Sequence, residues 1–280
     1  MARLQQLKRL KEKVEALGGK PVVVSAELGK APTPEQIEAA AEGHELKAIA
    51  VVYNETSTGA TTRGLKEVGK IAQAHGALFI VDAISILGGD ELPTDDWGVD
   101  LCITGSQKCL ACPPGLALIS VSERAWQVIE KAQTRAYYFD LLKMREFQER
   151  LETPFTPALS LYFALDEALR MLQEEGLEAR IKRHRECASM FYSGLKKLGL
   201  EPFAAEPWRS NTVISIKNPL GVEGRKLREL MRGKYGVVIA GGMGELKDTI
   251  LRIGNMGIVD QAIVSRTLEA LGKALDELRA

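Results

Sequence analysis

The sequence predicts an α/β fold, in which a larger domain built on a mainly parallel, helix-covered sheet is followed by a smaller α+β domain. Two observations predict this fold. In the first half of the chain, segments with helical spacing of apolar residues alternate with short, continuous apolar runs, as expected for parallel strands covered on both faces. After about residue 201 the order changes to strand, helix, strand, strand and helix, which is typical of an α+β unit.

The first half of the chain contains the alternating elements. Four leucines and a valine between residues 4 and 17 lie at helical spacing. Thr33 and Pro34 match an N-cap and a first helical position. The run at 116–121 follows its neighbour too closely for a crossover helix, so we expect it to be antiparallel. The predicted helices are 3–18, 34–42 and 65–75, and the predicted strands are 21–25, 47–53, 77–82, 99–104 and 116–121.

The second half begins with two long helical patterns, at 157–174 and 177–198, which connect the two parts of the chain. We therefore place the domains at residues 1–175 and 176–280. The smaller domain is expected to contain strands at 212–216, 237–239 and 250–253 and helices at 222–234 and 260–278.

The composition is that of a globular protein with a substantial core. The chain has 280 residues, of which 45% are hydrophobic and 26% charged, and its 37 basic side chains balance 37 acidic ones. This balance favours neither nucleic acid nor a membrane as partner. The sequence shows no apolar run long enough to cross a bilayer, and its beginning lacks the apolar core of a signal peptide, so we expect a cytoplasmic location.

Two of the four cysteines have the spacing of a redox or metal site. Cys109 and Cys112 form a C-x-x-C pair, which is compatible with redox chemistry or with half of a zinc site. No second cysteine pair or close histidine pair completes a set of metal ligands in the sequence. We therefore expect reduced structural thiols and no metal.

A lysine and an aspartate follow two of the predicted strands. Lys108 comes after the apolar run that ends near residue 104, and Asp82 ends the run that begins at residue 77. Ligands of such sheets bind beyond the carboxyl ends of the strands, where the segment 53–56 also falls. A lysine partly desolvated at such a cleft can act as a Schiff-base nucleophile, and a nearby carboxylate can face a protonated ring nitrogen. This pair suits pyridoxal phosphate.

Several separated motifs, in the same order, carry a resemblance to a known family. They are NETSTG at 54–59, HGALFIVDAISILGG at 75–89, DLCITGSQKCLACPPGLALISVS at 100–122, ETPFTPALSLYFALDEAL at 152–169 and IAGGMGELKDTILRIGNMG at 239–257. The chain resembles the class V aminotransferases of pyridoxal phosphate fold-type I, and within them the alanine–glyoxylate and serine–pyruvate group. The resemblance covers essentially the whole chain.

The resemblance implies roles for individual residues. Lys108 would bind the cofactor covalently and move a proton between it and the substrate, and Asp82 would keep the pyridine nitrogen protonated. Thr56 or Ser57 would donate a hydrogen bond to the ring hydroxyl oxygen. Gln107 would contact the cofactor at its phosphate, and the adjacent Ser106 is a second phosphate candidate.

Three further residues have implied roles. Arg252 lies within an apolar strand, where an arginine is costly unless it is paired, so a structural salt bridge is one explanation. Its match to the family's RIG motif favours a bidentate clamp for the substrate α-carboxylate. Thr153 and Thr156 resemble the segment that reaches the phosphate of a neighbouring subunit, although threonine before proline also marks an extended turn. The resemblance also implies a homodimer.

The chain departs from the family pattern at its beginning. Family members have an N-terminal arm, a glycine- and serine-rich phosphate-binding loop and an aromatic residue that stacks on the cofactor. This sequence begins in what resembles the next helix, so we expect an N-terminally truncated large domain. A separately encoded N-terminal fragment, a truncated product and a degenerate paralogue are the alternatives.

The function expected from these observations is transamination between alanine or serine and glyoxylate or pyruvate. One alternative is a class V lyase or cysteine desulfurase, but no cysteine follows Cys187 to serve as the mobile catalytic group, and Gln107 stands where desulfurases usually have histidine. The other alternative is an inactive or partner-completed remnant that acts as a binding or structural subunit.

Overall fold

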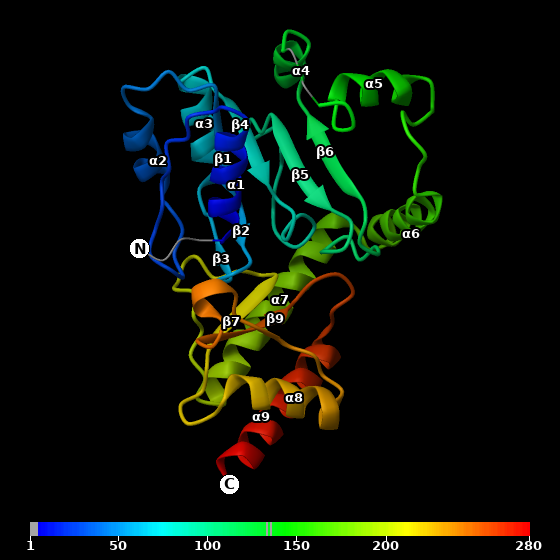
Figure 1. The fold of residues 1–280 in the computed structure, drawn as a ribbon. Coiled ribbons are helices and arrows are strands. Elements are labelled where there is room, and N and C mark those ends of the chain that lie inside the picture. The colour runs from blue at the N-terminus through cyan, green and yellow to red at the C-terminus, as the bar shows by residue number, and fades with distance from the viewer. Residues whose placement is uncertain (1–4, 133, 135) are drawn as a thin grey trace.

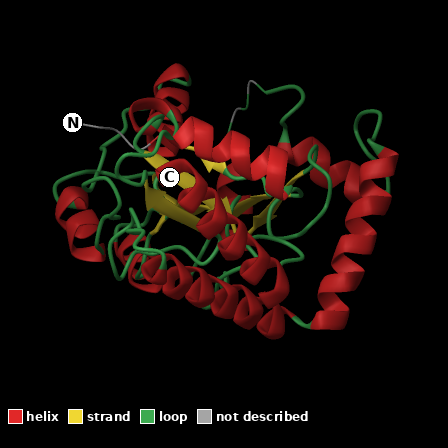
Figure 2. Ribbon diagram, turned by 90° about the horizontal axis from the view of Figure 1, so that it is seen from below, coloured by secondary structure: helices red, strands yellow, loops and turns green. Residues whose placement is uncertain are grey.

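The computed structural model describes residues 5–280 apart from residues 133 and 135. The chain forms a larger unit around a four-stranded sheet and a smaller unit around a three-stranded sheet. The larger unit lies above the smaller one in Figure 1. Figure 2, seen from below, shows helices on both sides of the strands. The expected α/β architecture is therefore present.

The sheet of the larger unit has the order β1-β4-β5-β6. The first three strands are parallel to one another and β6 is antiparallel to β5, as expected from the short connection. Their bounds are β1 Ala48–Val52, β4 Leu78–Asp82, β5 Leu101–Gly105 and β6 Ala117–Val121. The register pairs Val52 with Asp82 and Asp82 with Ile103, so these strands end at one common edge.

Helices cover this sheet because its strands are apolar. Phe79 and Val81 of β4 are fully buried in a cluster with apolar residues of α3, Leu65–Ala74. Next to α3 lies α2, Pro34–Ala41, which begins with the expected Thr33 cap and a complete capping box. The remaining early helix is α1, Gln5–Ala16, which lies in front of β1 and β4 in Figure 1.

Short elements connect the larger unit to the rest of the chain. An antiparallel ribbon, β2 Asn54–Glu55 with β3 Ala60–Thr61, follows β1 and reaches the smaller unit, where the Thr61 amide donates to the carbonyl of Trp208. After β6 come four helices that lead into the smaller unit. They are α4 Glu123–Ile129, α5 Leu141–Glu149, α6 Leu159–Glu175 and α7 Leu177–Lys197.

The smaller unit packs α7, α8 and α9 against an antiparallel sheet of order β7-β9-β8. Its core contains fully buried Phe191, Ile214, Leu227 and Leu271, one from each of these helices and from β7. The bounds are β7 Val213–Lys217, α8 Gly224–Tyr235, β8 Ala240–Gly241, the 3₁₀ turn η1 Gly244–Leu246, β9 Ile250–Gly254 and α9 Gln261–Arg279.

Two predicted strands are wrong. Residues 21–25 and 237–239, all within the described part of the chain, form no strand. Val22, Val23 and Val238 are exposed, Val238 by 77%, and no strand of the described residues pairs with these two segments. The sequence also did not predict α4, α5 and the β2–β3 ribbon. Residues 3 and 4 of the predicted first helix lie outside the described residues.

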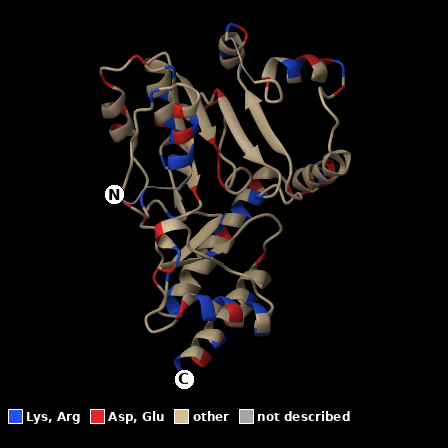
Figure 3. Ribbon diagram, viewed as in Figure 1, with Lys and Arg blue, Asp and Glu red and all other residues tan. Residues whose placement is uncertain are grey.

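The two hydrophobic clusters of the fold are separate. One cluster uses residues between 37 and 102, and the other uses residues between 187 and 275. A division at residues 175 and 176, between α6 and α7, stays a prediction. Among the described residues, no helix combines the length and the apolar character that a membrane span requires. Basic and acidic residues are interspersed over both units (Figure 3).

Candidate active site

The common edge of β1, β4 and β5 brings the sequence-predicted residues of the larger unit into one region. Asp82 is the last residue of β4, and Lys108 lies three residues beyond the end of β5. Thr56 and Ser57 lie between β2 and β3, which follow β1 directly. Both Lys108 and Asp82 are half-buried, as expected for side chains at the end of a covered sheet.

The Asp82 carboxyl is held by its own chain and faces a cation. Its Oδ1 accepts a hydrogen bond of 3.1 Å from the Ile84 amide. Burial raises the pKa of Asp82, and this outweighs the opposing effects of the Ile84 amide and of the Lys13 ammonium of α1. A partly desolvated carboxyl of this kind is a candidate for interaction with a charged ligand.

A tight turn positions Lys108. The Lys108 carbonyl accepts from the Ala111 amide at 3.0 Å, and Ala111 has a φ of 61°, in the left-handed region. Ser106 is buried, and its hydroxyl donates to the Pro113 carbonyl at 2.7 Å and accepts from the Leu116 amide at 3.3 Å. The Ser106 hydroxyl thus stabilises the turn, and its role at a phosphate stays a prediction.

Gln107 lies beside the lysine and is exposed. A Cβ atom on Gly105 would lie 2.8 Å from Gln107 Oε1, so the Gln107 side chain folds back over the end of β5. The Gln107 amide therefore lies at the strand edge, and its contact with the cofactor phosphate stays a prediction.

The loop between β2 and β3 contains the two hydroxyl candidates. Thr56 Oγ1 accepts a 3.0 Å hydrogen bond from Gln6 Nε2 of α1. Ser57 is buried and its hydroxyl donates to Glu55 Oε1 at 2.7 Å. The other carboxylate oxygen of Glu55 accepts a hydrogen bond from the backbone N–H of Gln6 at 3.1 Å. Of the two hydroxyls, that of Thr56 is the less buried.

Arg252 connects the smaller unit to this loop by a hydrogen bond. It lies on β9, and its Nη1 donates to the Thr56 carbonyl at 2.8 Å while Nε donates to the Gly241 carbonyl at 2.9 Å. Burial lowers the pKa of Arg252, and the nearby Glu55 carboxylate opposes this effect. The guanidinium therefore lies at the boundary of the two units, beside the strand ends of the larger one.

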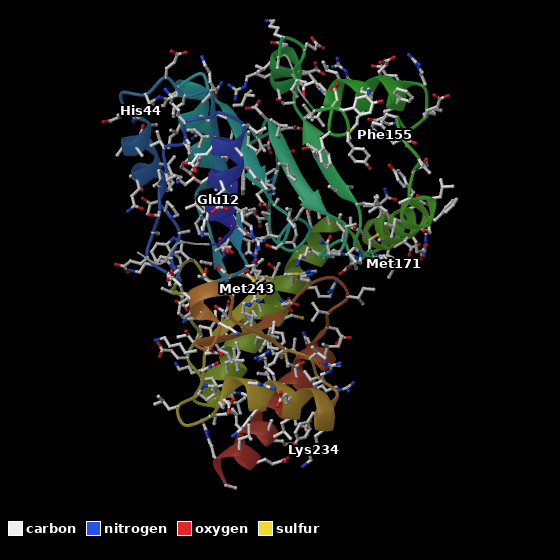
Figure 4. All side chains as sticks on the ribbon, viewed as in Figure 1. Glu12, His44, Phe155, Met171, Lys234 and Met243 are labelled. Atoms are coloured by element: carbon white, nitrogen blue, oxygen red, sulfur yellow. The ribbon has the colours of Figure 1, made fainter. Side chains whose placement is uncertain are left out.

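Thr153 and Thr156 do not join this group within the chain. The Thr153 hydroxyl donates to the Phe155 carbonyl at 2.8 Å, and Thr156 is exposed. Phe155 stacks on Tyr138 with ring centroids 4.7 Å apart. Figure 4 shows Phe155 near α5, on the side of β6 opposite α1. Contact of these threonines with a phosphate in another subunit stays a prediction.

All four cysteines, which lie in described parts of the chain, are buried and unpaired. Burial raises the pKa of Cys109 to about 12 and that of Cys102 to about 11. A thiol that stays protonated at neutral pH is a poor nucleophile, which agrees with the expectation of structural thiols. The described residues contain no group of three or more potential metal ligands.

The sequence did not reveal several residues of this region. Gln6 and Lys13 of α1 contact or face the candidate site, although α1 showed only an amphipathic pattern. Glu55 lies in a segment that the sequence placed at a strand end, but its buried position beside Arg252 had no sequence signal. Arg180 of α7 donates to the Cys109 carbonyl at 3.3 Å, next to Lys108.

Comparisons with known proteins identify the family of the chain. The family model of the class-V aminotransferases matches residues 11–245. An uncharacterised aminotransferase of Methanocaldococcus jannaschii is 44% identical over 268 residues, which are 95% of this chain and 69% of that protein. The alanine–glyoxylate aminotransferase of Drosophila melanogaster is 38% identical, over 87% of this chain and 63% of its own length.

A solved structure gives the same result for the fold. The ureidoglycine–glyoxylate aminotransferase of Bacillus subtilis superimposes with a TM-score of 0.90 at 34% identity, and the match covers 97% of this chain and 71% of that one. The resemblance that the sequence motifs suggested is confirmed by a family match over most of the chain and by relatives well above 30% identity. The chain belongs to the class-V aminotransferase family.

Proposed function

We propose that this chain is a pyridoxal-phosphate-dependent aminotransferase that transfers an amino group between a small amino acid and a 2-oxo acid. One observation carries the proposal. The Arg252 guanidinium of the smaller unit binds the backbone at Thr56, at the same sheet edge that Asp82 and the Lys108 turn follow. An amine, a half-buried carboxyl and an arginine at one boundary are the groups that this chemistry needs.

The residues present fit the cofactor. The Asp82 carboxyl is partly desolvated and would hold the proton of the pyridine nitrogen. The buried Gln6 Oε1 has no hydrogen-bond partner among the described residues, and its amide group lies beside Thr56. A hydroxyl entering this place would satisfy an acceptor that is costly to leave unpaired. When bound, pyridoxal phosphate supplies a ring that takes up the electron pair released at the substrate α-carbon.

Each residue then has a defined task. Lys108 Nζ would hold the cofactor and move a proton to and from the substrate α-carbon. Gln107 and, if its turn opens, Ser106 would contact the phosphate, and Thr56 or Ser57 would contact the ring hydroxyl. Arg252 donates hydrogen bonds from Nε and Nη1 to two backbone carbonyls. Its remaining N–H groups lie in the same plane and would bind the carboxylate of the substrate.

The substrates we propose are small. Alanine or serine would be the amino donor, and glyoxylate or pyruvate the acceptor. The Drosophila relative is an alanine–glyoxylate aminotransferase and the Bacillus structure is a ureidoglycine–glyoxylate aminotransferase, which supports glyoxylate as the acceptor. A cysteine desulfurase is the weaker alternative, because the last cysteine of the sequence, Cys187, is fully buried in the core of the smaller unit.

A homodimer is part of the proposal. Tyr137, Tyr138 and Phe139 are exposed, and α6 presents Leu159, Tyr162 and Phe163 to solvent. We call these six side chains, five of which are aromatic, the aromatic surface. Exposed apolar groups in such number are typical of protein interfaces. Thr153 and Thr156 lie in the segment between the two parts of this surface, so a second subunit bound there would be close to them.

Two other predictions concern the setting of the enzyme. Four free thiols support a reducing compartment, and we propose the cytoplasm. The chain matches 69% of the length of its Methanocaldococcus relative and 63% of its Drosophila relative. The aminotransferase relatives favour an active enzyme over an inactive or partner-completed remnant.

The test is covalent capture of the cofactor. The purified chain is mixed with pyridoxal phosphate, its visible spectrum is recorded, and borohydride reduction is followed by peptide mapping. We expect a Schiff-base band that changes on addition of alanine or serine and is restored by glyoxylate, with the label on Lys108. K108R should lose the band, and K66R, which alters an exposed lysine of α3, should keep it. A wild-type chain without band or label would refute the proposal for this chain alone.

A further inference from the structure

A buried arginine of α7 contacts the turn that contains Lys108. Arg180 is only 2% exposed, although its guanidinium is charged at any ordinary pH. Its Nε donates to Glu175 Oε2 at 2.8 Å, and its Nη1 donates to the Cys109 carbonyl at 3.3 Å. Because an unpaired buried charge is very costly, these two acceptors fix the guanidinium, and the guanidinium in turn fixes the Cys109 carbonyl.

The same carboxylate binds a second arginine. Arg183 donates from Nε and Nη2 to Glu175, and its Nη1 donates to the Gly257 carbonyl at 3.1 Å and to the Val259 carbonyl. Hydrogen bonds from Arg183 and, to a lesser extent, from Arg180 lower the pKa of Glu175 to about 2. The carboxylate is therefore ionised at any pH at which the enzyme would work, and the cluster persists.

The two arginines thus hold two segments that meet. Gly257, with a φ of 70°, lies five residues after Arg252 and packs on the lysine turn. A Cβ atom at Gly257 would lie 3.1 Å from Ala111 Cβ and 3.6 Å from the Lys108 carbonyl oxygen. The cluster of Glu175, Arg180 and Arg183 therefore holds the Lys108 turn and the chain that follows Arg252 to the same end of α7.

We propose that Arg180 is a positioning residue, which holds the Lys108 turn and thereby keeps Nζ at the strand edge where the cofactor would bind. This inference rests on the proposed function. Replacing a whole buried ion pair by apolar side chains is often neutral for stability, because desolvation offsets the attraction of the charges. The specific result of the arrangement is a fixed carbonyl one residue from the nucleophile, supported by a helix of the other unit.

The decisive variant is R180K, with R124K as matched control. Lysine keeps the charge at position 180 but cannot donate in two directions from one plane, so the bond to Cys109 is lost. Arg124 has the same pattern of partners at the opposite edge of the sheet: it donates to buried Asp100 and, at 3.0 Å, to the Ala77 carbonyl. The Arg124 side chain is more exposed than that of Arg180, and R124K therefore reports the general cost of weakening an arginine's bonds to a buried carboxylate and a backbone carbonyl.

The measurement separates capture from binding. Capture forms a C=N bond between Nζ and the aldehyde carbon and releases water, and its rate follows from the visible band. We expect R180K to capture pyridoxal phosphate about tenfold more slowly, the order of effect of one hydrogen bond to a charged group. R124K should capture at the wild-type rate. In a K108A background, where no capture is possible, R180K should leave the dissociation constant unchanged.

Two results would overturn the proposal: R124K slows capture as much as R180K does, or R180K weakens cofactor binding equally with and without Lys108. If the wild-type chain captures no cofactor, the proposed function fails, and amide hydrogen exchange of the cofactor-free chain tests the positioning separately. The bonded amides of Ala111, Cys112 and Leu116 should then exchange faster in R180K than in wild type or R124K. Unchanged protection would refute the role of Arg180.

Discussion

Asp82 combines a stability cost with its proposed chemistry. Burial places its pKa in the folded chain above the ordinary value, so ionisation costs the folded state more than the unfolded state. The cost is present above the folded-state pKa and disappears as the pH falls below the unfolded value of about 4. A carboxyl kept at such a cost is more typical of a site than of a structural position.

We therefore expect D82N to be more stable than the wild type in urea unfolding of the cofactor-free chain at pH 7, and to lose this advantage near pH 4. The same variant should lower the transamination rate by about 100-fold or more, because it removes the charge that stabilises the protonated ring nitrogen. D95N changes an exposed aspartate and should do neither. A D82N chain that is less stable at pH 7 would contradict the assignment of burial as the dominant effect.

At this scale, the sequence could predict the residues that follow apolar strands, such as Lys108 and Asp82, because strand ends can be recognised from local pattern. It could not predict residues that depend on distant partners. Gln6 binds Glu55 across 49 positions, and Arg180 binds the Cys109 carbonyl across 71. Such contacts exist only after the chain has folded, and an amphipathic helix shows the same pattern with or without them.

Among the elements, the junction of α6 and α7 has a clear dependence on pH. Glu175 has a pKa of about 2, below its ordinary 4.5, so its contribution to folding is fully present above pH 4.5 and is lost as the pH falls toward 2. The contribution is at most about 3 kcal/mol, because the side chain is partly exposed.

We expect E175Q to lower the free energy of unfolding at pH 7 by up to this amount and to flatten the acid limb of stability between pH 4.5 and 2. The neighbouring Glu174 forms only an exposed pair with Arg170, so E174Q serves as control and should change little. Denaturant unfolding from pH 2.5 to pH 7 gives both values. Parallel acid limbs for wild type and E175Q would show that the cluster does not determine acid stability.

The helix α1 lies where the proposed cofactor contacts are. Gln6 Nε2 donates a hydrogen bond to the Thr56 hydroxyl, and the Lys13 ammonium faces the Asp82 carboxyl. A ring hydroxyl that contacts Thr56 would also give Gln6 Oε1 its missing partner, so cofactor binding should stabilise the helix. We expect the amides of residues 5–16 to exchange more slowly when pyridoxal phosphate is bound, with α9 as an internal control. Faster exchange in α1 would mean that the cofactor displaces the helix from Thr56 and Asp82.

The sequence predicted most elements, because their apolar residues follow one period over a sufficient length. It was wrong at 21–25 and 237–239, where short valine runs have strand propensity but no strand to pair with. The short β2–β3 ribbon gave no signal, since two residues show no period. Such elements depend on contacts with the smaller unit, as between Thr61 and Trp208.

For the whole molecule, the aromatic surface predicts association. Phe163 is 74% exposed on α6, and a glutamate there would place a charge in the proposed interface. We expect wild type to sediment as a dimer and F163E as a monomer in analytical ultracentrifugation. L220E changes an isolated leucine that is also highly exposed, and it should remain dimeric. A wild-type chain that is monomeric at all concentrations would exclude this interface.

The order of the larger sheet has a practical consequence for handling the protein. β1 and β6 are its outer strands, so each has a row of backbone N–H and C=O groups on the side away from the sheet. Such edges are templates for other chains, and a formal net charge of zero at pH 7 gives little repulsion to keep molecules apart. We expect light scattering by concentrated solutions to rise near neutral pH and to fall at pH 9, where the molecules share a negative charge.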